Sequence, residues 1–166
     1  MKTLIAYSSK SGNTKMVAEA IHELDKENLD ISDIRDIKDV EGYERVVVGF
    51  WIDKGTANQE ALKFIETLEG KDVAFFFTLG AKADSDHAKD CVKACTELFS
   101  KNRLIGHSHC QGRIDPKFIE WMKTLPLDHP HGPNEASLKR WEAAAPHPTE
   151  DDIKGIKSDF SKILAL

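Results

Sequence analysis

The chain has 166 residues, 40% of them hydrophobic, and a formal net charge of −5, so it is long enough for one folded domain with a substantial core. This acidic balance, without a basic stripe, argues against nucleic acid as a partner. No apolar run approaches the ~20 residues that span a bilayer, and no signal peptide precedes the first strand. The three cysteines form no paired framework, so we expect a protein of the reducing cytoplasm that does not bind membranes.

Strands and helices are expected to alternate along most of the chain. The predicted strands cover residues 2–7, 29–34, 45–50, 73–79 and 104–112. The predicted helices begin at residue 13 and near residue 61, and a third is capped by Ser85 or Asp84. A short helix is opened by Asp115-Pro116, another covers 135–145 and a last one begins at residue 150. We expect the first helix to end at residue 25 and the second at Gly70. Nearly continuous apolar strands are typical of a parallel sheet that is covered on both faces.

A polar stretch, Ser8-Ser9-Lys10-Ser11-Gly12-Asn13-Thr14, separates the first strand from the first helix. Backbone N–H groups at a helix N-terminus have no partners inside the helix, so this first loop favours an anion such as phosphate. Gly12 lets the backbone turn, and polar side chains add donors: Ser9, Ser11, Asn13 and Thr14. The alternative is an ordinary Ser/Gly turn.

Other phosphate-binding loops do not fit this stretch. It has neither the Gly-x-x-x-x-Gly-Lys-Ser/Thr motif of a nucleotide P-loop nor the three glycines of a dinucleotide fingerprint. It also lacks a nucleophilic cysteine and an acidic phosphate acceptor. We therefore predict a phosphate that is held and not cleaved.

Alternating strands and helices with a phosphate site in the first loop predict an α/β fold with a doubly wound five-stranded parallel sheet of order 2-1-3-4-5. In this fold a ligand binds outside the carboxyl ends of strands one, three and four, at the switch point of the sheet. The three loops that follow those strands are the first loop, a second loop at residues 51–56 and a third loop at residues 78–82.

Residues 9–14 match every specified position of Ser/Thr-x-Ser/Thr-Gly-x-Thr, the first loop of the flavodoxin family, which binds the phosphate of FMN. The chain resembles that family over about residues 1–112 and in the last helix. The resemblance implies FMN as a noncovalent cofactor and a phosphate held by Ser9, Lys10, Ser11, Gly12, Asn13 and Thr14.

In flavodoxins the loops after the third and fourth strands flank the flavin ring. The resemblance therefore implies ring contacts from Trp51, Ile52, Asp53, Lys54 and Gly55 and from Thr78, Leu79, Gly80, Ala81 and Lys82. Trp51 is expected to stack on the ring, and its alternative role is a core or lid aromatic. The resemblance implies no catalytic residue and no metal ligand, because the flavin carries the chemistry.

The chain departs from the family pattern in its charges. Many flavodoxins surround the ring with carboxylates, whereas here each loop carries a lysine: Lys10, Lys54 and Lys82. A nearby cation favours an anionic reduced flavin, so we expect the hydroquinone potential of the flavin to be less negative than in acidic flavodoxins. The alternative is three lysines that extend into water.

A second departure is an extra segment at residues 113–147, inside a single flavodoxin-like domain that spans residues 1–166. It is a C-terminal helical extension before the last helix and does not match the insertion of long-chain flavodoxins. Three alternative roles are open for this segment: a partner-recognition surface, a flap over the flavin, or a structural addition.

Two other clusters have alternative interpretations. His107, His109 and Cys110 carry zinc-ligating side chains, but Cys110 is expected to point away from the two histidines on the same strand. Cys91 and Cys95 lie one helical turn apart on an apolar stripe, so we expect core residues and not a redox pair.

The resemblance implies an electron carrier that delivers electrons to a larger redox enzyme. The alternatives are an FMN-dependent NAD(P)H oxidoreductase that acts on a small acceptor, and a flavin-free interaction module. Residues 49–56 resemble a subgroup from anaerobic bacteria, some members of which accompany a bilirubin reductase. The oligomeric state stays open.

Overall fold

The computed structural model describes residues 1–166 and contains one six-stranded sheet. The strands are β1 (Thr3–Tyr7), β2 (Leu29–Asp33), β3 (Arg45–Asp53), β4 (Thr56–Ala57), β5 (Asp72–Leu79) and β6 (Arg103–Gln111). The helices are α1 (Asn13–His22), α2 (Gln59–Glu66), α3 (Asp86–Glu97), α4 (Pro116–Met122), α5 (Glu135–Ala144) and α6 (Glu150–Ile163), with a short 3-10 helix, η1 (Ile34–Asp36).

Five strands are parallel and follow the order β2-β1-β3-β5-β6, while β4 pairs with β3 in the antiparallel sense. Because β4 stands outside the parallel series, β5 and β6 are the predicted strands four and five, and the predicted order is confirmed. The apolar strands β3 and β5 lie inside the sheet, and the more polar β2 forms an edge, as their sequences indicate.

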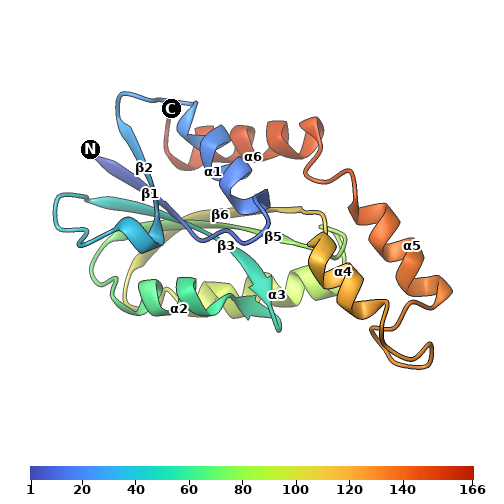
Figure 1. Cartoon of the computed structure of the whole chain (residues 1–166). Helices are drawn as coiled ribbons and strands as arrows, with labels where there is room; N and C mark the ends of the chain where they lie inside the picture. The colour runs from blue at the N-terminus through green and yellow to red at the C-terminus, as the bar shows by residue number, and fades with distance from the viewer.

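Helices α2 and α3 cover one face of the sheet, and α1 and α6 cover the other (Figure 1). The core beneath α2 and α3 contains stacked aromatic rings from the sheet and from the turn that follows α3: Phe50, Phe75, Phe77 and Phe99. In the opposite core, the ring of Phe160 on α6 meets Phe76 edge to face. These two cores hold the strands, and therefore the ends of the strands, in fixed positions.

The largest difference from the sequence analysis is at the second loop. Strand β3 does not end at residue 50 but continues through Trp51 to Asp53 and turns at Lys54 and Gly55 into β4. Both turn residues take positive φ, 51° and 82°, the combination that a two-residue type I′ hairpin needs. Trp51 therefore lies on a paired strand and not in a free loop.

Two helices are shorter than predicted, because their last turns tighten into i→i+3 hydrogen bonds. Helix α1 ends at His22, before residue 25, and the Leu24 N–H donates to the Ile21 carbonyl at 3.0 Å. Helix α2 ends at Glu66, and Gly70, at a φ of 68°, lies beyond it.

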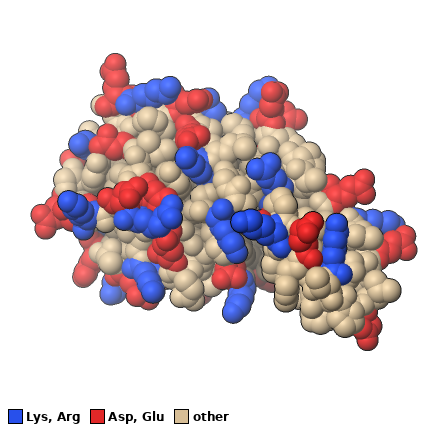
Figure 2. All heavy atoms as spheres, viewed as in Figure 1, with Lys and Arg blue, Asp and Glu red and all other residues tan.

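Residues 113–147 form a lobe that projects beyond the carboxyl ends of the strands (Figure 1). Asp115 caps α4, as predicted, and its side chain accepts a hydrogen bond from the Lys117 N–H. Four large apolar side chains of the lobe are exposed: Phe118, Trp121, Leu127 and Leu138. The rings of Phe118 and Trp121 stack on each other. Figure 2 shows a correspondingly uncharged area over the lobe, at lower right.

No helix of the chain is both long enough and apolar enough to cross a membrane.

Candidate functional site

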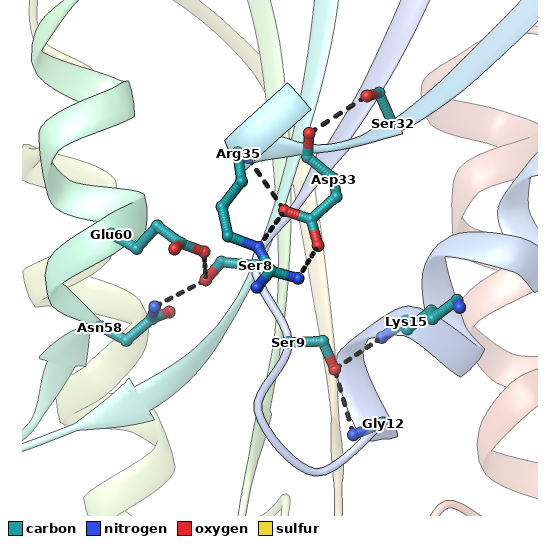
Figure 3. Close-up of polar contacts among 9 residues, drawn as sticks. All are labelled: Ser8, Ser9, Gly12, Lys15, Ser32, Asp33, Arg35, Asn58 and Glu60. Atoms are coloured by element: carbon teal, nitrogen blue, oxygen red, sulfur yellow. Dashed lines mark hydrogen bonds and ion pairs between the residues drawn. The ribbon is translucent and has the colours of Figure 1, made fainter. Parts of the chain in front are cut away.

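The first loop directs backbone N–H groups toward one oxygen atom. Ser9 Oγ accepts hydrogen bonds from the backbone N–H of Gly12 at 3.2 Å and of Lys15 at 3.3 Å (Figure 3). Gly12, at a φ of 93°, makes the turn into α1. The N-terminus of α1 therefore presents two donors to an electronegative atom in the loop, which is the arrangement that binds an anion.

The last two residues of the predicted loop turn their polar atoms toward the protein. Asn13 and Thr14 are buried, and Thr14 Oγ1 lies 3.0 Å from Thr78 Oγ1. Asn13 Nδ2 donates to the Arg113 carbonyl at 2.8 Å, while Asn13 Oδ1 is buried without a partner. The hydroxyls that remain half-buried at the loop are those of Ser9 and Ser11.

A second polar network joins the first loop to α2 (Figure 3). Ser8 Oγ donates to Glu60 Oε1 at 2.6 Å and accepts from Asn58 Nδ2 at 2.8 Å. Asn58 Oδ1 in turn accepts from the Trp51 N–H at 3.3 Å. The end of β1, the end of β3 and the start of α2 are thus fixed relative to one another.

These three elements enclose an open pocket of about 300 Å³. Its walls are Ser8, Ser9 and Lys10 from the first loop, Trp51 and Asp53 from β3, and Asn58, Gln59 and Glu60 at the start of α2. Trp51 is half-buried, and the Lys10 Nζ lies 5.7 Å from the centroid of its ring. An aromatic wall beside hydrogen-bonding groups suits a flat, polar-edged molecule.

The hairpin and the third loop contribute backbone more than side chains. Ile52 is half-buried beside the exposed Lys54, and Gly55 allows the turn between them and β4. Thr78 and Leu79 are buried at the end of β5, so only the backbone that follows can reach a ligand. Gly80 and Lys82 are exposed and Ala81 is half-buried.

The structure therefore brings the expected residues together in part. Ser9, Lys10, Trp51 and Asp53 line one pocket, whereas no residue of the third loop does. The third loop instead touches the first through the Thr14–Thr78 contact. Four further residues line this pocket that no sequence motif indicated, although each stands at a strand end or a helix start: Ser8, Asn58, Gln59 and Glu60.

Charged groups beside the first loop include one bidentate ion pair, whose arginine is largely exposed. Arg35 Nε and Nη2 donate to the two carboxylate oxygens of Asp33 at 3.1 and 2.8 Å (Figure 3). These hydrogen bonds hold the pKa of Asp33 below its usual 3.8, although burial acts in the opposite direction, and they raise the pKa of Arg35. Lys10 and Lys15 are exposed in the first loop and the first turn of α1, and the carboxylates of Asp53 and Glu60 line the adjoining pocket, so charges of both signs surround the loop.

The histidines of β6 serve packing. His107 stacks on Phe75 and His109 stacks on Phe77, so the two share a face as predicted. Cys110 packs into the opposite core. No group of three or more His, Cys, Asp or Glu side chains is placed to hold a metal ion.

Cys91 and Cys95 are free thiols in the core beneath α3, which confirms their packing role. Burial raises the pKa of both thiols, that of Cys95 to about 12, so they stay protonated at neutral pH.

The family model of the flavodoxin domain matches residues 4–161. The chain belongs to the flavodoxin family. It is 32% identical over 162 residues to the flavodoxin-like domain-containing protein BilS of Clostridioides difficile (strain CD3), covering 92% of this chain and 90% of that protein. The protein of the same name from Clostridium symbiosum (strain WAL-14163) is 27% identical over 172 residues, with the same coverage of both chains.

Solved flavodoxins share the fold. Oxidised flavodoxin 2 from Bacillus cereus superposes with a TM-score of 0.64 at 18% identity and covers 99% of both chains. A flavoprotein from Lactobacillus acidophilus NCFM in complex with FMN gives a TM-score of 0.55 at 21% identity, over 72% of this chain and 97% of that one. The predicted family resemblance is thus confirmed.

Proposed function

We propose that this flavodoxin-family protein binds FMN without a covalent bond and carries electrons to a larger redox enzyme. The observation that carries the proposal is the first loop, where two backbone N–H groups at the N-terminus of α1 point at the Ser9 hydroxyl, and Ser9 and Trp51 line the same pocket. A phosphate group and a flat aromatic ring joined by a polar chain would use both parts at once.

The donors of the first loop fit a phosphate. In the structure Ser9 Oγ accepts the N–H groups of Gly12 and Lys15, so these amides are already directed at an oxygen atom. A bound phosphate oxygen would take those two hydrogen bonds and free the Ser9 hydroxyl to donate. Ser11 adds a hydroxyl, and Lys10 and Lys15 add positive charge.

The pocket and the neighbouring backbone fit the rest of the molecule. Trp51 gives an aromatic face for the flavin ring. The carboxylates of Asp53 and Glu60 would accept hydrogen bonds from hydroxyl groups of the bound FMN. Backbone groups of Gly80 and Lys82 would face the edge of the ring.

Bound FMN would supply the electron transfer itself, and the protein supplies its position and its electrostatic surroundings. The BilS relatives and the resemblance of residues 49–56 make a bilirubin reductase the first partner enzyme to test. Three free thiols suit the reducing cytoplasm.

Residues 1–166 form one flavodoxin-like domain in this proposal, and the lobe is an addition to it.

The experiment is an FMN titration of the apoprotein, followed by anaerobic stepwise reduction of the complex. Tight binding, reduction by one-electron donors and slow reduction by NADH or NADPH are the expected results. Rapid two-electron reduction by a nicotinamide would instead favour the oxidoreductase. No binding of FMN would overturn the proposal.

A further inference from the structure

Residues 111–114 run from the last residue of β6 along the carboxyl edge of the sheet toward α4, and we call them the strap. The strap holds the end of β5 through two hydrogen bonds. The Gly112 N–H donates to the Leu79 carbonyl at 2.8 Å, and Gln111 Nε2 donates to the Gly80 carbonyl at 3.0 Å. A Cβ atom on Gly80 would lie only 3.0 Å from the Ile114 side chain. The third loop is therefore packed against the strap.

The strap also contacts the first residue of α1. The buried side chain of Asn13 donates to the Arg113 carbonyl at 2.8 Å. Gly112 permits this contact, because a Cβ atom there would lie 2.6 Å from Asn13 Nδ2. One four-residue segment thus touches both the first and the third loop of the candidate flavin site.

A third set of contacts anchors the strap from outside the site. The Arg113 N–H donates to the His147 carbonyl at 2.8 Å. The ring Nδ1 of His147 lies 2.5 Å from Oδ2 of Asp152, and the same oxygen accepts from the Thr149 N–H at 2.8 Å. The side chains of His147 and Asp152 are 24% and 22% exposed, so water competes little for this bond.

We propose that the strap, anchored by the His147–Asp152 pair, positions the first and third loops for simultaneous binding of the phosphate and the ring of FMN. This inference rests on the proposed function. A site that is already ordered before binding spends less of its binding free energy on ordering loops. His147 and Asp152 are positioning residues, because they act on the two loops only through the strap.

The test compares Asp152→Asn with Asp151→Asn. Both substitutions remove one negative charge from the first turn of α6, but Asp151 is exposed and makes no ion pair or side-chain hydrogen bond. For Asp152→Asn we expect the Kd for FMN to rise roughly tenfold, from the loss of one charge-assisted hydrogen bond. Hydrogen exchange should become faster at residues 12–15 and 79–82. Asp151→Asn should change neither the Kd nor the exchange rates. Asp152→Glu should keep both near their wild-type values, because Glu retains the carboxylate and also completes a capping box.

A purely structural role gives a different result. If Asp152→Asn lowers the Tm but leaves both the FMN affinity of the folded protein and the exchange at the two loops unchanged, the proposal is overturned. Should Asp152→Asn fail to fold, Gly112→Ala tests the strap from its other end, since the added Cβ presses on Asn13. If the wild-type protein does not bind FMN, the proposed function fails, and the exchange measurements still decide whether the strap orders the loops.

Discussion

The ammonium group of Lys10 lies 5.7 Å from the ring centroid of Trp51, so a cation of the first loop sits over the aromatic wall of the pocket. This contact joins two segments that the sequence analysis treated as separate binding loops. It also places at least one of the three loop lysines beside the site where we expect the flavin. Lys54 and Lys82 are exposed at the hairpin and the third loop.

Replacing Lys10, Lys54 and Lys82 together by Gln should make the reduction potential of bound FMN more negative, because a nearby cation stabilises a reduced flavin anion. With partly screened interactions of about 0.5 kcal/mol for each lysine, about 1.5 kcal/mol in all, the expected shift is about 65 mV for a one-electron couple. Anaerobic redox titration against dyes of known potential measures it. A matched triple variant at Lys26, Lys38 and Lys101, which lie outside the three loops, should leave the potential unchanged.

Ser11→Asp should weaken FMN binding by at least tenfold, because a carboxylate in the first loop repels the phosphate dianion. The same variant should bind riboflavin, which has no phosphate, as the wild type does. Ser11→Asn, which has a similar size and no charge, is the control. Fluorescence titrations with both flavins measure the effect, and wild-type affinity of Ser11→Asp for FMN would mean that the phosphate lies elsewhere.

The alternating elements and the place of the first loop could be predicted because they depend on local patterns, and the sheet order then followed from the usual topology of such a chain. Apolar strands such as β5 and the polar stretch before α1 are visible within a few residues. The hairpin after β3 was missed because Lys54 adopts a positive φ, which lysine seldom takes and no local pattern indicates. The sequence therefore predicts a loop at residues 51–56, where the structure has the paired ends of β3 and β4.

The partners of the loop side chains could not be predicted for a different reason. Asn13 bonds to a carbonyl 100 residues away and Thr14 to a hydroxyl 64 residues away, so their orientations depend on tertiary contacts. Ser8, Asn58 and Glu60 meet only once β1 and α2 are packed on the same sheet. The patterns that predict strands and helices place such residues at the crevice, but they do not predict the hydrogen bonds that the side chains form.

Two tryptophans of the lobe should respond very differently to truncation. Trp141 on α5 is 7% exposed, whereas Trp121 on α4 is 53% exposed and stacks only on the exposed Phe118. Trp141→Ala should destabilise the protein by about 3–5 kcal/mol through the cavity that it leaves. Trp121→Ala should change the free energy of unfolding by only about 0.5 kcal/mol. Urea denaturation followed by circular dichroism compares the two, and equal effects would contradict the packing described for the lobe.

Gly49 on β3 makes room for the ring of Phe76 on β5. A Cβ atom on Gly49 would lie 2.0 Å from Phe76 Cζ, and the Phe76 side chain is completely buried. Gly49→Ala should therefore destabilise the fold by about 3 kcal/mol. Phe76→Leu, which replaces the ring by a shorter side chain, should relieve part of this loss, so the double variant should be more stable than the sum of the single effects allows. Additive effects in thermal unfolding would show that the ring shifts without strain.

Asp152 should make the stability of the protein sensitive to acid. Burial alone raises the pKa of this carboxyl, but the hydrogen bonds from His147 and Thr149 outweigh it and hold the pKa below 3.8. Because the folded-state pKa is depressed, the stabilisation is fully present above the unfolded-state pKa and is lost as the pH falls below about 4. Asp152→Asn should therefore be less stable than the wild type at pH 7, and this difference should shrink toward pH 2. Measuring the Tm of both proteins across that range tests the prediction, and a difference that stays constant with pH would contradict it.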